Sequence, residues 1–281
     1  MSTFTTSMFE SIKGALTKNN EATSSKFKDI LKTEAGNTYT VRLLPNVKDP
    51  AKTFFHYYSY GWNSFATGQL ITAVSPTTWN QRDPIAEERY RVLRNGTEKE
   101  KGKALAIKRR ENWLVNCYVV NDPVNSDNNG KIKVIRFGRQ LHKIIMDAIE
   151  GEEAAELGAR IFDLSAKGCN LRIKVEKQGD YPTYVSSKFS TPKEIEGLDE
   201  ADFNKIYNSA FDLETYVTVK SYDELKTILD EHYHGTKDVE ETETVQETSA
   251  PKPTVEVVAK KATKKATEDD DDSIKELLKD L

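Results

Sequence analysis

Two stretches of the chain interleave basic side chains with aromatic rings, the residue types that contact phosphates and stack on unpaired bases. Residues 99–113 and 131–143 supply these candidates: Lys108, Arg109, Arg110, Trp113, Lys133, Arg136, Phe137 and Arg139. A single run of charge is usually only a solvated face of a protein. Two such runs on neighbouring strands, each with an aromatic residue, predict a positive groove with stacking platforms.

A third stretch, FFHYYSYGWNSF at residues 54–65, is unusually rich in rings. Successive side chains of a strand point to opposite faces, so some of these rings, with Tyr58 as our candidate, face away from a core. The alternative is that each ring packs in the core or a hairpin. The grouping favours binding of single strands over duplex, because no helix carries a recognisable base-reading pattern.

Catalytic chemistry finds no support in the sequence. The phosphate-binding loops, the zinc-protease helix and the nucleophile elbow are all missing, and nothing selects two of the 45 Asp and Glu residues as an acid/base pair. The four histidines (His56, His142, His232 and His234) do not have zinc-ligand spacing, and there is no C-x-x-C. We therefore expect a binding protein without metal or cofactor.

The charge balance differs along the chain. The whole sequence has 41 Lys and Arg against 45 Asp and Glu, a formal net charge of -4. Residues 236–281 hold 8 Lys and Arg and 13 Asp and Glu. This leaves 33 basic and 32 acidic residues in residues 1–235, a net charge of +1. The acidity thus belongs to the C-terminal segment, and the rest of the chain can carry a cationic site.

Runs of β-branched and aromatic residues bounded by Pro, Gly and Asn predict most of the secondary structure as strands. We expect strands at residues 38–45, 54–62, 69–74, 113–120, 131–137 and 170–177, and helices near 140–150, 199–209 and 221–233. Short strands followed by scattered helices indicate a mainly β fold with α insertions, built on a barrel. Cys117 and Cys169 lie in strand-like runs, which favours buried free thiols over a disulfide. Free thiols in turn favour a cytosolic protein.

The two ends of the chain differ from the rest in composition. Within residues 1–25, Met8, Phe9, Ile12 and Leu16 fall on one face of a possible short helix, suited to docking on another surface, although a frayed start explains them equally well. Residues 236–267 are poor in aromatic residues and predict a flexible linker. Residues 268–281 join an acidic run to an amphipathic end, formed by Asp269, Asp270, Asp271, Asp272, Ile274, Leu277, Leu278 and Leu281.

The order of these features resembles the single-stranded DNA-binding, helix-destabilising proteins of T-even-like bacteriophages. The matching segments are AGNTYTVRLLPN at 35–46, IKRRENWLVNCYVVNDP at 107–123, GKIKVIRFGR at 130–139, YPTYVSSKF at 181–189 and the closing DDDDSIKELLKDL. The resemblance implies an OB-fold barrel over residues 26–235 that binds single-stranded DNA in a cleft. By position it adds Arg42 and Tyr184 to the candidate contacts given above.

The resemblance also implies a subdomain at about residues 60–105 that carries zinc in the family. Here the matching positions read Tyr60, about Ala73, Asp83 and Ala86, none of which is a thiolate. We therefore expect a zinc-free subdomain that is held together by packing of Trp62, Phe65, Trp79, Tyr90 and Leu93.

The implied function is coating of single-stranded DNA, without base preference, in phage replication, recombination and repair in the cytoplasm of the infected bacterial host. The N-terminal arm would contact neighbouring protomers on the DNA, although it lacks the family's basic cluster, and the tail would bind phage replication and recombination proteins. The tail would also compete with DNA for the cleft, unless it is simply a solubilising end. The alternative is an OB-fold adaptor that binds RNA or protein through its tail; we expect no membrane association and no enzymatic activity.

Overall fold

The computed structural model describes residues 28–179 and 181–235, and the two ends of the chain lie outside the described residues. The chain divides into two units, Met1–Lys237 and Asp238–Leu281, and every described residue belongs to the first. Among the described residues, no helix is both long and apolar enough to cross a membrane. The predicted arm, linker and acidic tail therefore lie outside the described residues.

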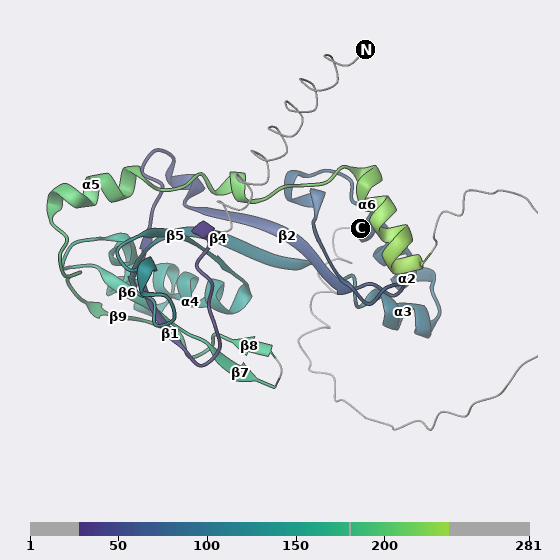
Figure 1. Cartoon of the computed structure of the whole chain (residues 1–281), viewed down its shortest axis with the longest axis horizontal. Helices are drawn as coiled ribbons and strands as arrows, with labels where there is room; N and C mark the ends of the chain where they lie inside the picture. The colour runs from purple at the N-terminus through teal and green to yellow at the C-terminus, as the bar shows by residue number, and fades with distance from the viewer. Residues whose placement is uncertain (1–27, 180, 236–281) are drawn as a thin grey trace, which may run out of the picture. The chain divides into compact units, whose positions relative to one another are not determined.

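The main element is an antiparallel seven-stranded sheet with the order β3-β2-β4-β1-β6-β9, in which β5 also pairs with β4 (Figure 1). Its strands are β1 (Thr38–Leu44), β2 (Phe54–Asn63), β3 (Leu70–Val74), β4 (Arg110–Asn121), β5 (Ile132–Phe137), β6 (Cys169–Lys174) and β9 (Lys188–Pro192). A separate hairpin joins β7 (Glu176–Gln178) to β8 (Tyr181–Thr183). The mainly β architecture with added helices is confirmed.

The helices are α2 (Pro84–Asn95), α3 (Glu98–Ala104), α4 (Arg139–Glu150), α5 (Glu200–Asn208) and α6 (Tyr222–Leu229), with short 3-10 turns between elements. The predictions of α4, α5 and α6 are confirmed, whereas α2 and α3 were not predicted. Local capping explains both: the Asp83 side chain accepts from the backbone of Ile85 and Ala86, and Thr97 forms a capping box with Glu100. Charged residues fill much of both helices, and the apolar residues that α2 buries (Pro84, Ile85 and Val92) are few.

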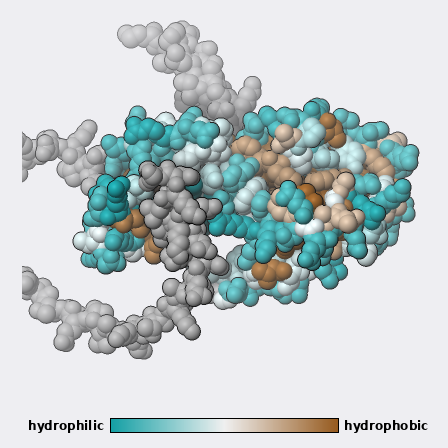
Figure 2. Space-filling view, turned by 180° about the vertical axis from the view of Figure 1, so that it is seen from behind, coloured by the Kyte–Doolittle hydropathy of each residue, from teal (hydrophilic) through white to brown (hydrophobic). Residues whose placement is uncertain are grey.

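The described residues form a larger and a smaller lobe, which β2 and β4 connect (Figure 1). The larger lobe contains the main core, where Val41, Val115 and Ile173 of the sheet pack with Leu141 and Ile145 of α4. The smaller lobe contains the end of β2, β3, α2, α3 and α6, packed around a second cluster. Seen from behind, the surface is mainly hydrophilic, with hydrophobic residues gathered over part of the larger lobe (Figure 2).

Packing within the smaller lobe agrees only in part with the prediction. Trp62 is buried as expected, and Trp79 and Leu93 are half-buried. Phe65 and Tyr90 are instead 49% and 46% exposed. Their place in the core is taken by Ile85, Ile107, Leu225, Leu229 and Tyr233, several of them from α6, which is distant in sequence.

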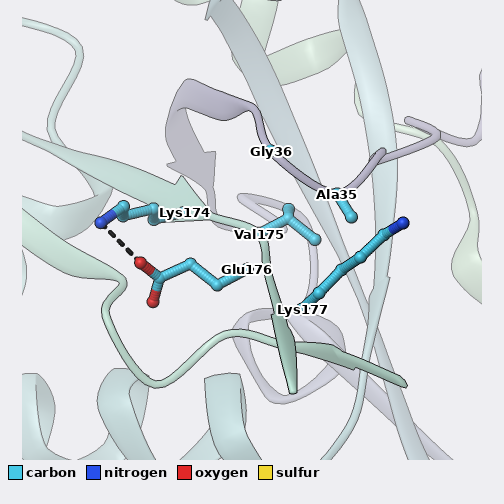
Figure 3. A pocket seen from close by; sticks show the side chains of 6 residues that line it. All are labelled: Ala35, Gly36, Lys174, Val175, Glu176 and Lys177. Atoms are coloured by element: carbon cyan, nitrogen blue, oxygen red, sulfur yellow. Dashed lines mark ion pairs between the residues drawn. The ribbon is translucent and has the colours of Figure 1, made fainter. Parts of the chain in front are cut away.

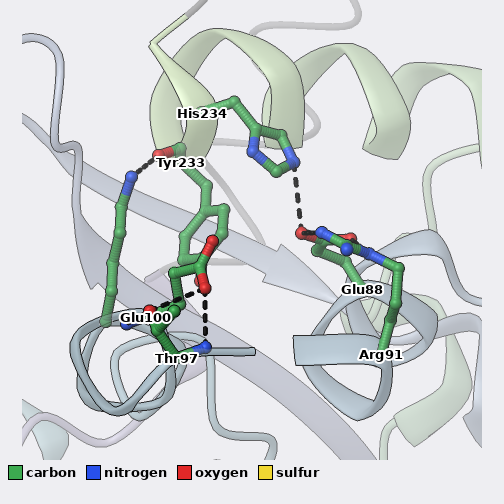
Figure 4. A network of polar contacts seen from close by, with 7 residues as sticks. Glu88, Arg91, Thr97, Glu100, Tyr233 and His234 are labelled. Carbon is green, nitrogen blue, oxygen red and sulfur yellow. Dashed lines mark hydrogen bonds and ion pairs between the residues drawn. The ribbon is translucent and has the colours of Figure 1, made fainter. Parts of the chain in front are cut away.

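Polar contacts hold the end of α6 and the following turn, Asp230–His234, on α2 and α3 (Figure 4). Figure 4 shows His234 directed at Glu88, with 3.5 Å between Nε2 and Oε1, and Arg91 paired with the same carboxylate at 2.7 Å. The Lys103 ammonium lies 4.6 Å from the ring centre of Tyr233 and donates to its backbone carbonyl. The end of the described chain is therefore anchored on the smaller lobe.

Candidate nucleic-acid interface

The register of three strands places Trp113 at the centre of one face of the sheet. Trp113 of β4 pairs with His56 of β2 on one side and with Phe137 of β5 on the other. Because side chains alternate along a strand, Glu111 and Val115 share this face while Arg110 and Leu114 lie on the opposite one. The face is covered in the larger lobe by α4 and continues along β2 and β4 toward the smaller lobe.

The rings on this face contact one another. The ring centre of Trp113 lies 4.0 Å from that of His142 of α4, with 20° between the planes, and 4.8 Å from that of His56. His56 in turn lies 4.7 Å from Tyr58 in an edge-on arrangement. Tyr58, His56, Trp113 and His142 thus form a continuous group of half-buried rings, which we call the ring row.

A guanidinium group covers the outer end of the ring row. The Arg109 guanidinium carbon lies 3.9 Å from the ring centre of Tyr58, and its Nη1 donates to Thr77 Oγ1 at 2.8 Å. The neighbouring Thr78 hydroxyl accepts from the Tyr58 backbone N–H at 3.0 Å. The turn after β3 therefore positions both members of this cation–π pair.

The other end of the ring row is bordered by the first turn of α4. Arg139 pairs with Glu111 at 2.7 Å, and the Arg139 side chain is 72% exposed. The next residue, Gln140, accepts a hydrogen bond from the backbone N–H of Tyr184 at 2.9 Å. Consecutive residues of α4 thus contact Glu111, beside the ring row, and the segment that follows the β7–β8 hairpin.

Burial determines the charge of the two imidazoles. It lowers the pKa of His56 and of His142 below the usual value near 6.5, and Glu111 opposes this shift in both cases. Both rings are therefore neutral at pH 7. The charged groups that border the ring row are then Arg109, Arg139 and Glu111.

The structure brings together four of the predicted contacts, namely Tyr58, Arg109, Trp113 and Arg139, with Tyr184 at the margin. Two others lie on the opposite face of the sheet: Arg110 donates to the Gly61 carbonyl at 3.1 Å, and Arg136 pairs with Leu114 in the β4–β5 register. Lys133 lies four residues before Phe137 on β5, and its ammonium donates to the Lys28 carbonyl at 2.7 Å. Lys108 is exposed just before Arg109.

The structure corrects the prediction that Arg42 contacts DNA, because Arg42 is 0% exposed. Its Nε donates to Asn170 Oδ1 and its Nη2 to the Lys193 carbonyl, both at 2.8 Å, and its Nη1 donates to the Asp163 carbonyl. A Cβ at Gly168 would clash with this guanidinium, so the glycine makes room for it. Arg42 therefore fastens the loop before β6 to β1 and does not reach a ligand.

The structure also corrects the prediction that Phe137 contacts DNA, because Phe137 is only 5% exposed. It packs edge-on against Phe54 at 6.4 Å between ring centres, inside the main core. Alternation along β5 alone does not reveal which face α4 covers. A ring predicted to stack on bases is therefore part of the core.

The sequence reasoning missed His56, His142, Glu111 and Gln140 as members of the site. It considered the histidines only as metal ligands, and among residues 28–179 and 181–235 no group of His, Cys, Asp and Glu is arranged to hold a metal. A signal was present in β2, where His56 and Tyr58 alternate and thus share a face. The contribution of α4 depends on tertiary packing.

The four positions that the resemblance matches to zinc ligands lie together. The Tyr60 hydroxyl donates to Asp83 Oδ2 at 2.9 Å, and Tyr60 pairs with Ala73 across β2 and β3. Asp83 Oδ1 accepts from the backbone N–H of Ala86 at 3.2 Å, and the Ser75 hydroxyl also donates to this carboxylate. One carboxylate already used as a helix cap, with no thiolate or imidazole, does not fit zinc.

Two hollows elsewhere on the larger lobe lack the features of a catalytic centre. One of about 430 Å³ is lined by Ala35, Gly36, Lys174, Val175, Glu176 and Lys177. Figure 3 shows Lys174 turned toward Glu176, with which it pairs at 2.7 Å. The other, of about 770 Å³, combines Arg172 and Lys193 with Glu194 and Glu196, so its charges balance.

The fold and the ring row define a class: a β-sheet protein with stacked rings and arginine side chains on one face. The chain belongs to the family described as gp32 DNA binding protein like, whose model matches residues 34–232. This confirms the resemblance stated from the sequence.

Two relatives, both named single-stranded DNA-binding protein, agree with this assignment. The chain is 28% identical over 203 residues to that of Enterobacteria phage T2 and 26% identical over 201 residues to that of Enterobacteria phage T4. Each match covers 69% of this chain and 65% of the relative's length.

Proposed function

We propose that this protein binds single-stranded DNA without base preference, through the ring row and its flanking arginines. The observation that carries the proposal is the continuous contact from Arg109 over Tyr58 through His56 and Trp113 to His142. Every base has a flat face, so stacking on such rings tolerates any sequence, and arginines beside them attract the phosphates. The family and the names of the relatives support the same function.

The finer parts of the proposal follow the family resemblance. The seven-stranded sheet is an OB-fold core, the arm at residues 1–25 links neighbouring protomers on the DNA, and residues 268–281 bind phage replication and recombination proteins. The protein works in the cytoplasm of the infected host. It acts as a binding protein and not an enzyme; in support, the Glu111 carboxylate beside the ring row is already paired with Arg139.

Titration with oligonucleotides of one length tests the proposal. Tryptophan fluorescence would be followed with single-stranded DNA, duplex DNA and single-stranded RNA at two salt concentrations. We expect single-stranded DNA to bind far more tightly than duplex, with an affinity that falls steeply with salt. Equal binding of duplex would contradict the proposal, and preferential binding of RNA would favour an RNA adaptor.

A further inference from the structure

His142 contributes a ring to the proposed DNA site from an element outside the sheet. It lies in the first turn of α4, is half-buried and stacks on Trp113 at 4.0 Å between ring centres. An aromatic face that a base would use on Trp113 is therefore already occupied by an imidazole. Unlike an indole, this ring can take up a proton and become positively charged.

We propose that His142 contacts the bound strand as an imidazolium, so that binding of single-stranded DNA takes up a proton. This inference rests on the proposed function and deepens it. The strand supplies phosphates to an imidazolium that already lies against the indole face of Trp113. A cation in that position gains both a phosphate partner and a cation–π contact.

The charged groups around His142 come from each element packed near it. Glu111 of β4 favours the charged form of His142, and His56 of β2 opposes it. Arg139, three residues earlier on α4, is paired with Glu111, and Trp113 and Phe137 carry no charge. In the free protein burial keeps the pKa of His142 below its usual range, so the ring is neutral at pH 7.

His56 is the less suitable of the two histidines for this role. Its Nε2 is buried without a hydrogen-bond partner among the described residues, so charging that ring leaves a buried charge unpaired. His56 also lowers the pKa of His142, as expected for two groups that repel when both are charged. We therefore expect uptake of at most one proton per bound site and assign it to His142.

The direction of the effect follows from the two protonation states. DNA raises the pKa of His142 above its low value in the free protein, so affinity increases as the pH falls through the bound-state pKa. The gain is complete below the free-state pKa. Each unit of difference between the two values corresponds to about tenfold in affinity.

The test uses oligo(dT), because thymine does not titrate between pH 5.5 and 8. The intact protein would be compared with His142→Phe, which keeps a stacking ring but cannot charge, and with His142→Gln. His234→Gln serves as the matched control, because His234 pairs with Glu88 on the smaller lobe. Calorimetry in two buffers of different ionisation enthalpy gives the number of protons taken up.

We expect the intact protein and His234→Gln to bind more tightly at pH 5.5 than at pH 8. The slope of log affinity against log salt should also be larger by about 0.7 at pH 5.5, the value for one more neutralised phosphate on a single strand. Both His142 variants should lose these differences between pH 5.5 and pH 8.

Proton magnetic resonance of the intact protein gives a check that needs no folded variant. With four histidines in the chain, the imidazole signals can be followed with pH, and one pKa should rise when oligo(dT) is added. Unchanged pKa values, or equal pH dependence in the intact protein and His142→Phe, would overturn the inference while leaving single-strand binding intact. If the protein bound oligo(dT) neither at pH 5.5 nor at pH 8, the proposed function itself would be contradicted.

Discussion

Arg109 and Arg110 are adjacent in the sequence, yet their guanidinium groups lie on opposite faces of the sheet. Arg109 covers the ring of Tyr58 at 3.9 Å, whereas Arg110 donates to the Gly61 carbonyl at 3.1 Å. The two side chains have the same charge, so they provide a matched pair for testing which face binds DNA.

Arg109→Gln should weaken binding of single-stranded DNA and reduce the slope of log affinity against log salt by about 0.7, because one phosphate contact is lost. Arg110→Gln should leave that slope nearly unchanged. Fluorescence titration at several salt concentrations measures both. Equal losses in the two variants would contradict the assignment of the ring-row face.

Tyr58→Ala should cost about 1–3 kcal/mol of binding free energy, the usual range for one base–ring stack. Tyr90→Ala is the control, because Tyr90 is 46% exposed on α2 of the smaller lobe, away from the ring row. Affinities for oligo(dT) at fixed salt give the comparison. A loss of similar size for Tyr90→Ala would place the binding surface elsewhere.

Arg42→Ala should destabilise the fold and leave the affinity of the folded protein nearly unchanged. Each buried oxygen that loses its donor costs about 1–3 kcal/mol, and Arg42 serves several. Urea unfolding compares this variant with Arg172→Ala, an exposed arginine on β6. If Arg42→Ala unfolds like the intact protein but binds DNA poorly, the original prediction of a DNA contact is restored.

The protein should contain no stoichiometric zinc after purification without added metal, because the Asp83 cluster offers no zinc-binding set. Chelators should leave the melting temperature unchanged. Asp83→Ala should lower the stability by about 0.5–2 kcal/mol through loss of the cap on α2 alone, and by more once Tyr60 and Ser75 lose their acceptor. Elemental analysis and thermal unfolding measure these outcomes, and one zinc per chain would refute the expectation.

Truncation after Lys265 should increase affinity for single-stranded DNA at low salt, because the acidic tail no longer competes for the cationic face. The effect should shrink as salt screens the tail. A tail with Asp269, Asp270, Asp271 and Asp272 changed to Asn separates charge from length. Equal affinities of all three proteins at low salt would leave only partner binding as the role of the tail.

Strand and helix positions could be predicted wherever local sequence determines them. The alternation of β2, β4 and β5 and the hydrophobic period of α4 come from side-chain direction along one element, which the sequence displays directly. The helices α2 and α3 escaped prediction because they bury few apolar residues, and their clearest local signal is the capping by Asp83 and Thr97.

The sequence by itself determined the family, the mainly β architecture, and the presence of basic and aromatic residues in the right segments. Only the tertiary structure decided which of them share a surface, because β-pairing register and the docking of α4 join residues far apart in the chain. Those long-range contacts placed His142 on Trp113 and buried Arg42 and Phe137. They also placed the Arg109 guanidinium over Tyr58, beside Thr77, and directed Arg110 to the Gly61 carbonyl.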